Sequence, residues 1–86
     1  MISKEIVVCC GSGLNNKQAT YFVQKANEFS SSIWLETGTR KMNAKSLLGI
    51  MSMSILSGTT ITLSASGPDA QEAMDALEVL LLKDVY

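Results

Sequence analysis

The chain has 86 residues, of which 47% are hydrophobic, and its seven basic and eight acidic residues give a formal charge of -1. A chain of this length forms one domain, residues 1–86, around a single small core. The near-neutral charge argues against direct binding to nucleic acid, which needs a basic surface. No stretch approaches the roughly 20 apolar residues that cross a bilayer, so we expect a cytoplasmic protein that does not enter the membrane. We expect no cofactor and no metal site, because the chain lacks histidine and its acidic residues are scattered.

The first half of the chain predicts strands and a helix from the spacing of its apolar residues. Alternation of apolar and polar residues indicates a strand, and recurrence every three or four residues indicates a helix with one buried side. Asn15, with Gln18 three residues later, has the form of an N-cap and a partial capping box. The expected elements are, in chain order, a strand over 2–8, a helix over 16–29, and a hairpin of strands over 33–36 and 40–43.

In the second half, Ser46 is expected to cap a short helix over 47–53. Residues 60–66 alternate almost perfectly as a strand, whose polar positions would face solvent. Asp69 and Glu72 predict a capping box at the start of the last helix. The order βαββαβα predicts an α+β fold, an open-faced β-sandwich in which a four-stranded antiparallel sheet carries three helices on one face.

Two segments carry motifs. Residues 13–19 are Gly-Leu-Asn-Asn-Lys-Gln-Ala, and residues 43–51 are Asn-Ala-Lys-Ser-Leu-Leu-Gly-Ile-Met. They resemble the two signatures of the HPr family, the small phosphocarrier proteins of the bacterial phosphoenolpyruvate-dependent sugar phosphotransferase system. The first signature of that family is Gly-Leu-His-x-Arg-Pro-Ala, and the second surrounds a regulatory serine. The resemblance covers the chain from end to end and implies the HPr fold.

The first signature departs from the family at three positions. Asn15 stands where the family has the histidine that takes phosphate from enzyme I and passes it to sugar-specific carrier subunits. A neutral carboxamide cannot accept a phosphoryl group as an imidazole can. Lys17 replaces a planar arginine by a point charge, and Gln18 replaces the proline that begins the helix. The resemblance therefore implies a degenerate phosphocarrier site at Asn15, Lys17 and Gln18, without catalytic residues, in a protein that is not an enzyme.

The second signature is kept at Ser46. By resemblance, this serine is the target of HPr kinase/phosphorylase. Phosphorylation of a capping serine would add about 1.5 to 2 negative charges at the positive end of a helix, and Lys41 and Lys45 are expected near enough to respond.

The short helix after Ser46 contains more apolar residues than an inward stripe needs. We expect Leu47 or Ile50 to point inward and the remainder to form an exposed patch, which commonly marks a docking surface. By resemblance, the partner-binding residues are Thr20, Gln24, Leu47, Leu48 and Met51.

Three functions remain open from the sequence. The first is a regulatory HPr-like protein that lacks the phosphoacceptor histidine and is comparable to the Crh branch of the family. Such a protein would be phosphorylated on Ser46 and would then bind a transcriptional regulator of carbon catabolite control. The second is a working phosphocarrier that exchanges phosphate with enzyme I and sugar-specific carrier subunits. The third is an interaction module without phosphorylation. Dimerisation by exchange of the first strand is also left open.

Overall fold

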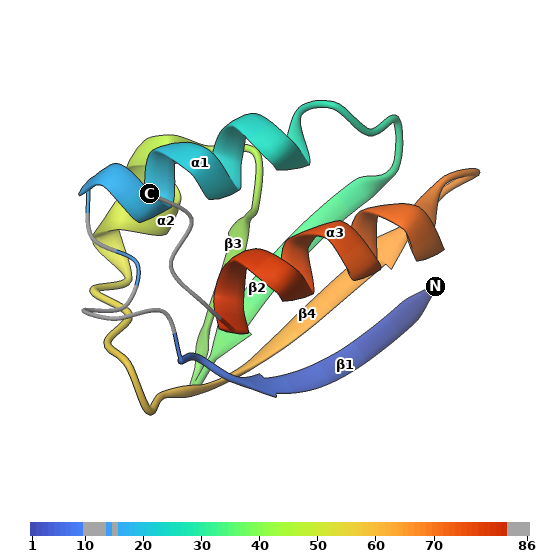
Figure 1. The fold of residues 1–86 in the computed structure, drawn as a ribbon. Helices are drawn as coiled ribbons and strands as arrows, with labels where there is room; N and C mark the ends of the chain where they lie inside the picture. Colours follow the sequence, from blue (N-terminus) through green and yellow to red (C-terminus); the bar gives the residue numbers. More distant parts are fainter. Residues whose placement is uncertain (10–13, 15, 83–86) are drawn as a thin grey trace.

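The computed structural model describes residues 1–9, 14 and 16–82, and within them a sheet carries three helices on one side (Figure 1). The order βαββαβα and the α+β class agree with the sequence prediction. No helix in the described ranges is long and apolar enough to cross a membrane. The elements are β1 (Ile2–Val7), α1 (Asn16–Ala26), β2 (Ser32–Thr37), β3 (Arg40–Asn43), α2 (Leu47–Ser52), β4 (Thr60–Ser66) and α3 (Ala70–Leu82).

The sheet has the strand order β1-β4-β2-β3, and every neighbouring pair is antiparallel. The predicted hairpin is formed by β2 and β3, where Thr37 pairs with Arg40 and Gly38 adopts a positive φ of 58°. Leu63 of β4 lies opposite Leu35 of β2 and Lys4 of β1. β4 and β2 are therefore the central strands of the sheet, and β1 and β3 are its edge strands.

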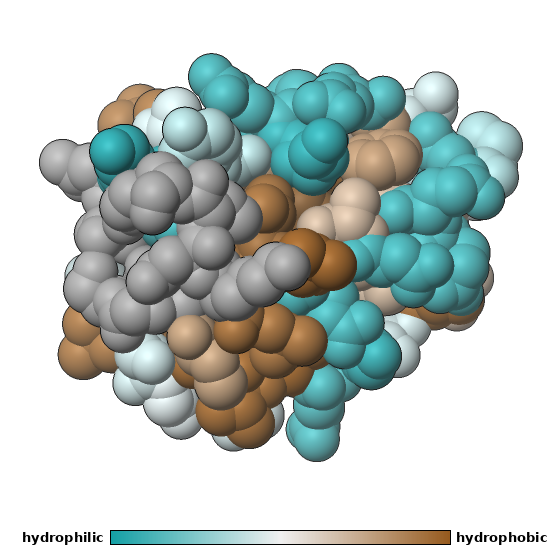
Figure 2. Space-filling view, viewed as in Figure 1, coloured by the Kyte–Doolittle hydropathy of each residue, from teal (hydrophilic) through white to brown (hydrophobic). Residues whose placement is uncertain are grey.

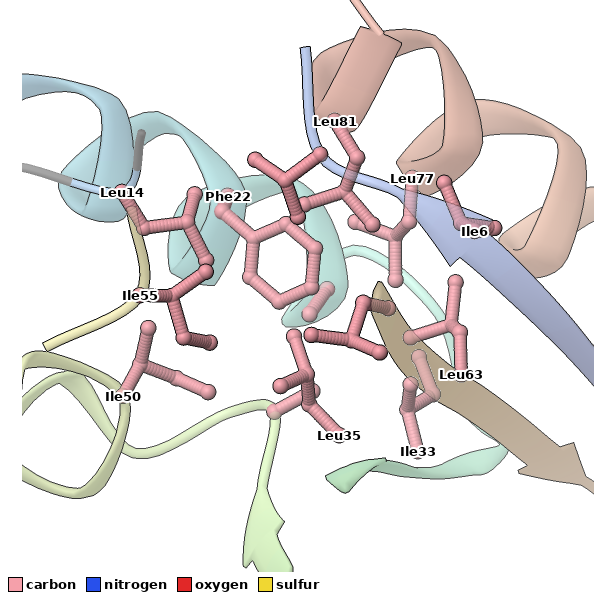
Figure 3. Close-up of a cluster of buried hydrophobic side chains, with 14 of the residues drawn as sticks. Ile6, Leu14, Phe22, Ile33, Leu35, Ile50, Ile55, Leu63, Leu77 and Leu81 are labelled. Carbon is pink, nitrogen blue, oxygen red and sulfur yellow. The ribbon is translucent and has the colours of Figure 1, made fainter. Parts of the chain in front are cut away.

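The core lies between the sheet and the helices (Figure 3). Phe22 of α1 and Leu77 of α3 are fully buried, and they face Leu35 and Leu63 of the sheet. Burial of each side chain of this size contributes about 1.5 to 3 kcal/mol to folding before the entropy cost is counted. This core fixes α1 and α3 side by side over the strands.

α1 ends at Ala26, three residues earlier than the spacing predicts. The chain continues in a turn, in which the amide of Phe29 donates to the carbonyl of Ala26 at 3.3 Å. Phe29 still packs partly buried against the core. Apolar periodicity therefore extends beyond the helix because the turn keeps this side chain on the buried side.

The open face of the sheet is less exposed to solvent at Ser64 than the sequence predicts. Ser64 of β4 is buried, and its hydroxyl forms a 2.9 Å hydrogen bond with the hydroxyl of Ser3 on β1. On the other side, Ser64 pairs with Trp34 of β2. The Lys41 ammonium lies 5.2 Å from the centre of the Trp34 ring, at cation-π distance. These neighbours remove Ser64 from solvent.

The capping box predicted at Asp69 and Glu72 is corrected by the structure. The carboxylate of Asp69 accepts from the backbone amides of Ser30 and Ser31, each at 2.9 Å, and from the Ser31 hydroxyl. The hydroxyl of Ser31 and the amide of Ser30 lower the pKa of Asp69. Glu72 is exposed in the first turn of α3. Asp69 therefore joins the α1–β2 loop to the start of α3.

Candidate functional site

Ser46 caps α2, as the sequence predicts. Its backbone is extended (φ -104°, ψ 111°), and its Oγ accepts from the amide of Gly49 at 3.1 Å. The Ser46 carbonyl accepts from the amide of Ile50 at 3.0 Å, which closes the first helical turn. A Cβ at position 49 would lie 3.2 Å from Ser46 Oγ, so the glycine leaves room beside the hydroxyl. Ser46 is exposed, and its hydroxyl lies at the start of the helix.

The outer side of α2 carries an apolar patch that we define as Leu47, Leu48 and Met51. Their exposed fractions are 37%, 83% and 37%. At about 100° per residue, these three positions span about 100° of the helix surface, and Ile50 lies about 160° from Leu48 but only about 60° from Leu47. Ile50 is completely buried, so of the two residues expected inward it is Ile50, and not Leu47, that enters the core. The patch begins directly after Ser46.

The second helix next to Ser46 is α1, which contacts α2. Thr20 is half-buried and Gln24 is exposed one turn later. Tyr21 lies on the same side and is 41% exposed, and the sequence analysis missed it. Its position one residue before the buried Phe22 is the signal that could have placed its ring outside. Leu56, beyond the end of α2, is also 66% exposed and was missed.

The described residues of the degenerate first signature differ in burial. Asn15, and with it the predicted helix cap, lies outside the described residues. Lys17 is exposed, whereas Gln18 is completely buried. The side-chain amide of Gln18 donates from Nε2 to the carbonyl of Leu80 at 2.9 Å and so connects α1 to the last turn of α3. Lys17 therefore lies at the surface, whereas Gln18 contributes to the packing of α1 against α3.

The two lysines expected to respond to a charge on Ser46 are engaged elsewhere. Lys45 donates from Nζ to the carbonyl of Phe29 at 2.7 Å. Lys41 lies over Trp34 on the open face of the sheet. At the other end of α2, Arg40 donates from Nη1 to the carbonyl of Ser52 at 3.0 Å. In the unmodified protein, therefore, the side chains of Lys41 and Lys45 contact groups other than Ser46, and their response to a phosphate on Ser46 stays a prediction.

The surface over the helices is chemically uneven. Figure 2 shows hydrophilic residues across the right-hand part of this face and several exposed hydrophobic residues in its left-hand and lower parts. In the described part of the chain, no three acidic, cysteine or histidine side chains come together as metal ligands. The site thus offers a capping hydroxyl, an apolar patch and the outer side of α1, an arrangement suited to contact with another protein.

Comparison with known proteins gives consistent matches over the whole chain. The family model described as "PTS HPr component phosphorylation site" matches residues 2–83. The HPr-like protein Crh of Halalkalibacterium halodurans is 46% identical over 84 residues, which cover 98% of this chain and 100% of that protein. The crystal structure of HPr-C-His from Thermoanaerobacter tengcongensis matches with a TM-score of 0.90 and 43% identity, covering 94% of this chain and 91% of the other. The solution structure of Crh, the Bacillus subtilis catabolite repression HPr, matches with a TM-score of 0.73 and 39% identity, covering 98% and 100%.

Proposed function

Because the chain belongs to the HPr family, we propose that it is a regulatory member of that family that has lost phosphotransfer through histidine. HPr proteins are phosphocarriers and not enzymes, so the proposal concerns contacts with other proteins. In this proposal, HPr kinase/phosphorylase phosphorylates Ser46, and the phosphorylated protein binds a transcriptional regulator of carbon catabolite control. The protein would act in the cytoplasm, without direct contact with nucleic acid or with the membrane.

One observation carries the proposal: an exposed capping serine beside an apolar patch, in a chain without histidine. The missing histidine removes the residue that forms a transferable phosphoramidate in the family. The serine offers a hydroxyl at the start of α2, where a phosphate would meet the positive end of the helix. The similarity to two proteins named Crh, one of them described as a catabolite repression HPr, supports the same role.

The proposed partner surface comprises both helices that border Ser46. The apolar patch on α2 supplies contact area, and the phosphate would add charge at its edge. Methionine side chains adapt to a partner and are common at promiscuous docking surfaces, and the exposed leucines add apolar area. We assign the contact with the regulator to Thr20, Gln24, Leu47, Leu48 and Met51.

Phosphorylation of Ser46 is tested with purified HPr kinase/phosphorylase and ATP. We expect the intact mass to increase by one phosphate in the wild type and to stay unchanged in Ser46→Ala. The phosphorylated wild type is then expected to bind the catabolite-control regulator more tightly than the unmodified protein. A wild type that stays unmodified would reject the proposal and leave an interaction module without phosphorylation.

Loss of phosphotransfer is tested with enzyme I and labelled phosphoenolpyruvate. We expect no acid-labile phosphate on the protein and no transfer to sugar-specific carrier subunits, because a carboxamide occupies position 15. A genuine HPr in the same mixture serves as the positive control. Acid-labile phosphate that passes to a carrier subunit would instead establish a working phosphocarrier.

A further inference from the structure

We propose that Lys45 and Asn27 form a clamp that positions Ser46 for modification, and that Lys45 is not a ligand of the phosphate. The effect on modification of Ser46 rests on the proposed function, whereas the contacts themselves are present in the unmodified protein. We call these contacts the α1–α2 clamp. It joins the end of α1 to the residue directly before Ser46.

The side chain of Lys45 forms the first half of the clamp. Its Nζ donates to the carbonyl of Phe29 at 2.7 Å, across 16 positions of the chain. Phe29 follows the end of α1, in the turn whose amide donates to Ala26. Lys45 is half-buried, so its charged hydrogen bond is only partly screened by water. The Lys45 ammonium is therefore bonded to the turn that follows α1.

Asn27 forms the second half and carries no charge. Its Nδ2 donates to the carbonyl of Val23 at 2.8 Å and to the carbonyl of Lys45 at 3.3 Å. The backbone amide of Asn27 also donates to Val23, at 3.0 Å. One side-chain amide therefore connects the last turn of α1 to the backbone that enters α2.

A local turn completes the restraint. The side-chain oxygen of Asn43 accepts from the amide of Lys45 at 2.8 Å, and its carbonyl accepts from the amide of Ser46 at 3.1 Å. The amide, the carbonyl and the ammonium of Lys45 are therefore all bonded. α2 has only six residues, and a helix of that length is not stable alone. Its first turn is therefore held in place by contacts outside the helix, which are the packing of Ile50 in the core and the clamp.

Hydrogen exchange tests the clamp without any partner. Lys45→Met and Asn27→Ala should each speed exchange at the amides of Gly49 and Ile50 by about tenfold, because these amides donate to Ser46. Lys45→Arg should keep exchange close to wild type. Lys25→Met is the matched control, since Lys25 forms an exposed pair with Glu28 at 3.2 Å and should change exchange less than about twofold. Unchanged exchange in Lys45→Met would overturn the clamp.

Phosphorylation kinetics separate positioning from recognition of charge. With HPr kinase/phosphorylase and ATP, both Lys45→Met and Asn27→Ala should lower kcat/KM for Ser46 by about three- to tenfold, whereas Lys25→Met should not. If kcat/KM falls only in Lys45→Met, the kinase recognises the charge of Lys45 directly, and this would overturn the inference. If the wild type is not phosphorylated at all, the proposed function fails, and the exchange experiment still decides the clamp.

The phosphate itself provides the last test. Its second pKa, near about 6 in a phosphoserine, is measured by phosphorus NMR in the phosphorylated wild type and in phosphorylated Lys45→Met. We expect the value to rise only slightly in Lys45→Met, because the ammonium keeps its charge but is held at the carbonyl of Phe29 and not at the phosphate. A clearly higher pKa in Lys45→Met would identify Lys45 as the counter-ion of the phosphate and overturn the inference.

Discussion

The carboxylate of Asp69 is used for a contact that its local sequence does not indicate. By position it is an N-cap, since α3 begins at the next residue. In the fold, Ser30 and Ser31 donate to it from 39 and 38 positions earlier in the chain. The amide of Asp69 in turn donates to the Ser31 hydroxyl at 3.2 Å. The residue therefore exchanges hydrogen bonds with the α1–β2 loop.

These contacts predict how stability depends on acid. The pKa of Asp69 is lower in the folded protein than its ordinary value of 3.8, with the Ser31 hydroxyl as the largest cause. The stabilisation is therefore fully present above the unfolded pKa and is lost as the pH falls through the folded pKa. Asp69→Asn should lower the free energy of unfolding at neutral pH and weaken its decline in acid. Urea unfolding between about pH 2 and about pH 7 measures both effects.

Asp75→Asn is the control for this pH experiment. It removes a carboxylate from the same helix, one that accepts from Gln71 at 2.9 Å. The free energy of unfolding of Asp75→Asn should decline in acid as steeply as that of the wild type. If the free energy of unfolding of Asp69→Asn also declines in acid as steeply as that of the wild type, other carboxylates determine the decline.

The capping hydroxyl of Ser46 gives a second prediction at the scale of one residue. Ser46→Ala should reduce the free energy of unfolding by about 1 kcal/mol, because the amide of Gly49 loses its acceptor. Ser32→Ala, at an exposed position of β2, should change it by less than about 0.5 kcal/mol. Urea unfolding at neutral pH compares the two. Equal small effects would mean that water replaces the cap without cost.

At the scale of elements, the link from β4 to α3 depends on a close approach. Gly67 follows β4 with a φ of 147°, and a Cβ there would lie 2.7 Å from Ser31 Cα and 2.6 Å from Ser31 Oγ. The backbone of the α1–β2 loop therefore occupies the space of a side chain. Gly58, before β4, also has a positive φ, of 94°, but a Cβ there would meet nothing within 4 Å.

The two glycines predict unequal losses on substitution. Gly58→Ala should cost about 1 to 2 kcal/mol from backbone strain alone. Gly67→Ala adds a collision with Ser31 and should cost about 1 to 3 kcal/mol more. Denaturant midpoints of the two variants measure the difference. Equal losses would indicate that the loop moves away from the new methyl group.

The order of elements and the cap at Ser46 could be predicted because their signals are local. Apolar spacing identifies the strands and helices, and a serine before a helix is a cap by its own chemistry. The contact of Gln18 with Leu80 joins residues 62 positions apart, and no local pattern encodes it. The engagement of Lys45 by Phe29 escaped prediction for the same reason. The spacing also could not decide between Leu47 and Ile50, since both are apolar and only the packed core selects one.

For the whole molecule, stability and the proposed binding come from opposite sides of the same helices. Phe22 and Ile50 are completely buried on the inner sides of α1 and α2. Gln24 and Leu48 lie exposed on α1 and α2. Figure 3 shows that the inner residues converge on one cluster with those of the sheet and α3. Changes to the outer residues should therefore alter binding without altering the fold.

Leu48→Ser and Ile50→Ala test this separation on one helix. Leu48 is 83% exposed, so Leu48→Ser should change the free energy of unfolding by less than about 0.5 kcal/mol. Ile50 is completely buried, and Ile50→Ala should cost about 2 to 5 kcal/mol. Calorimetric titration of the phosphorylated proteins with the regulator should show a loss of affinity of at least about tenfold in Leu48→Ser. Because that variant stays folded, undiminished affinity would remove the apolar patch from the binding surface.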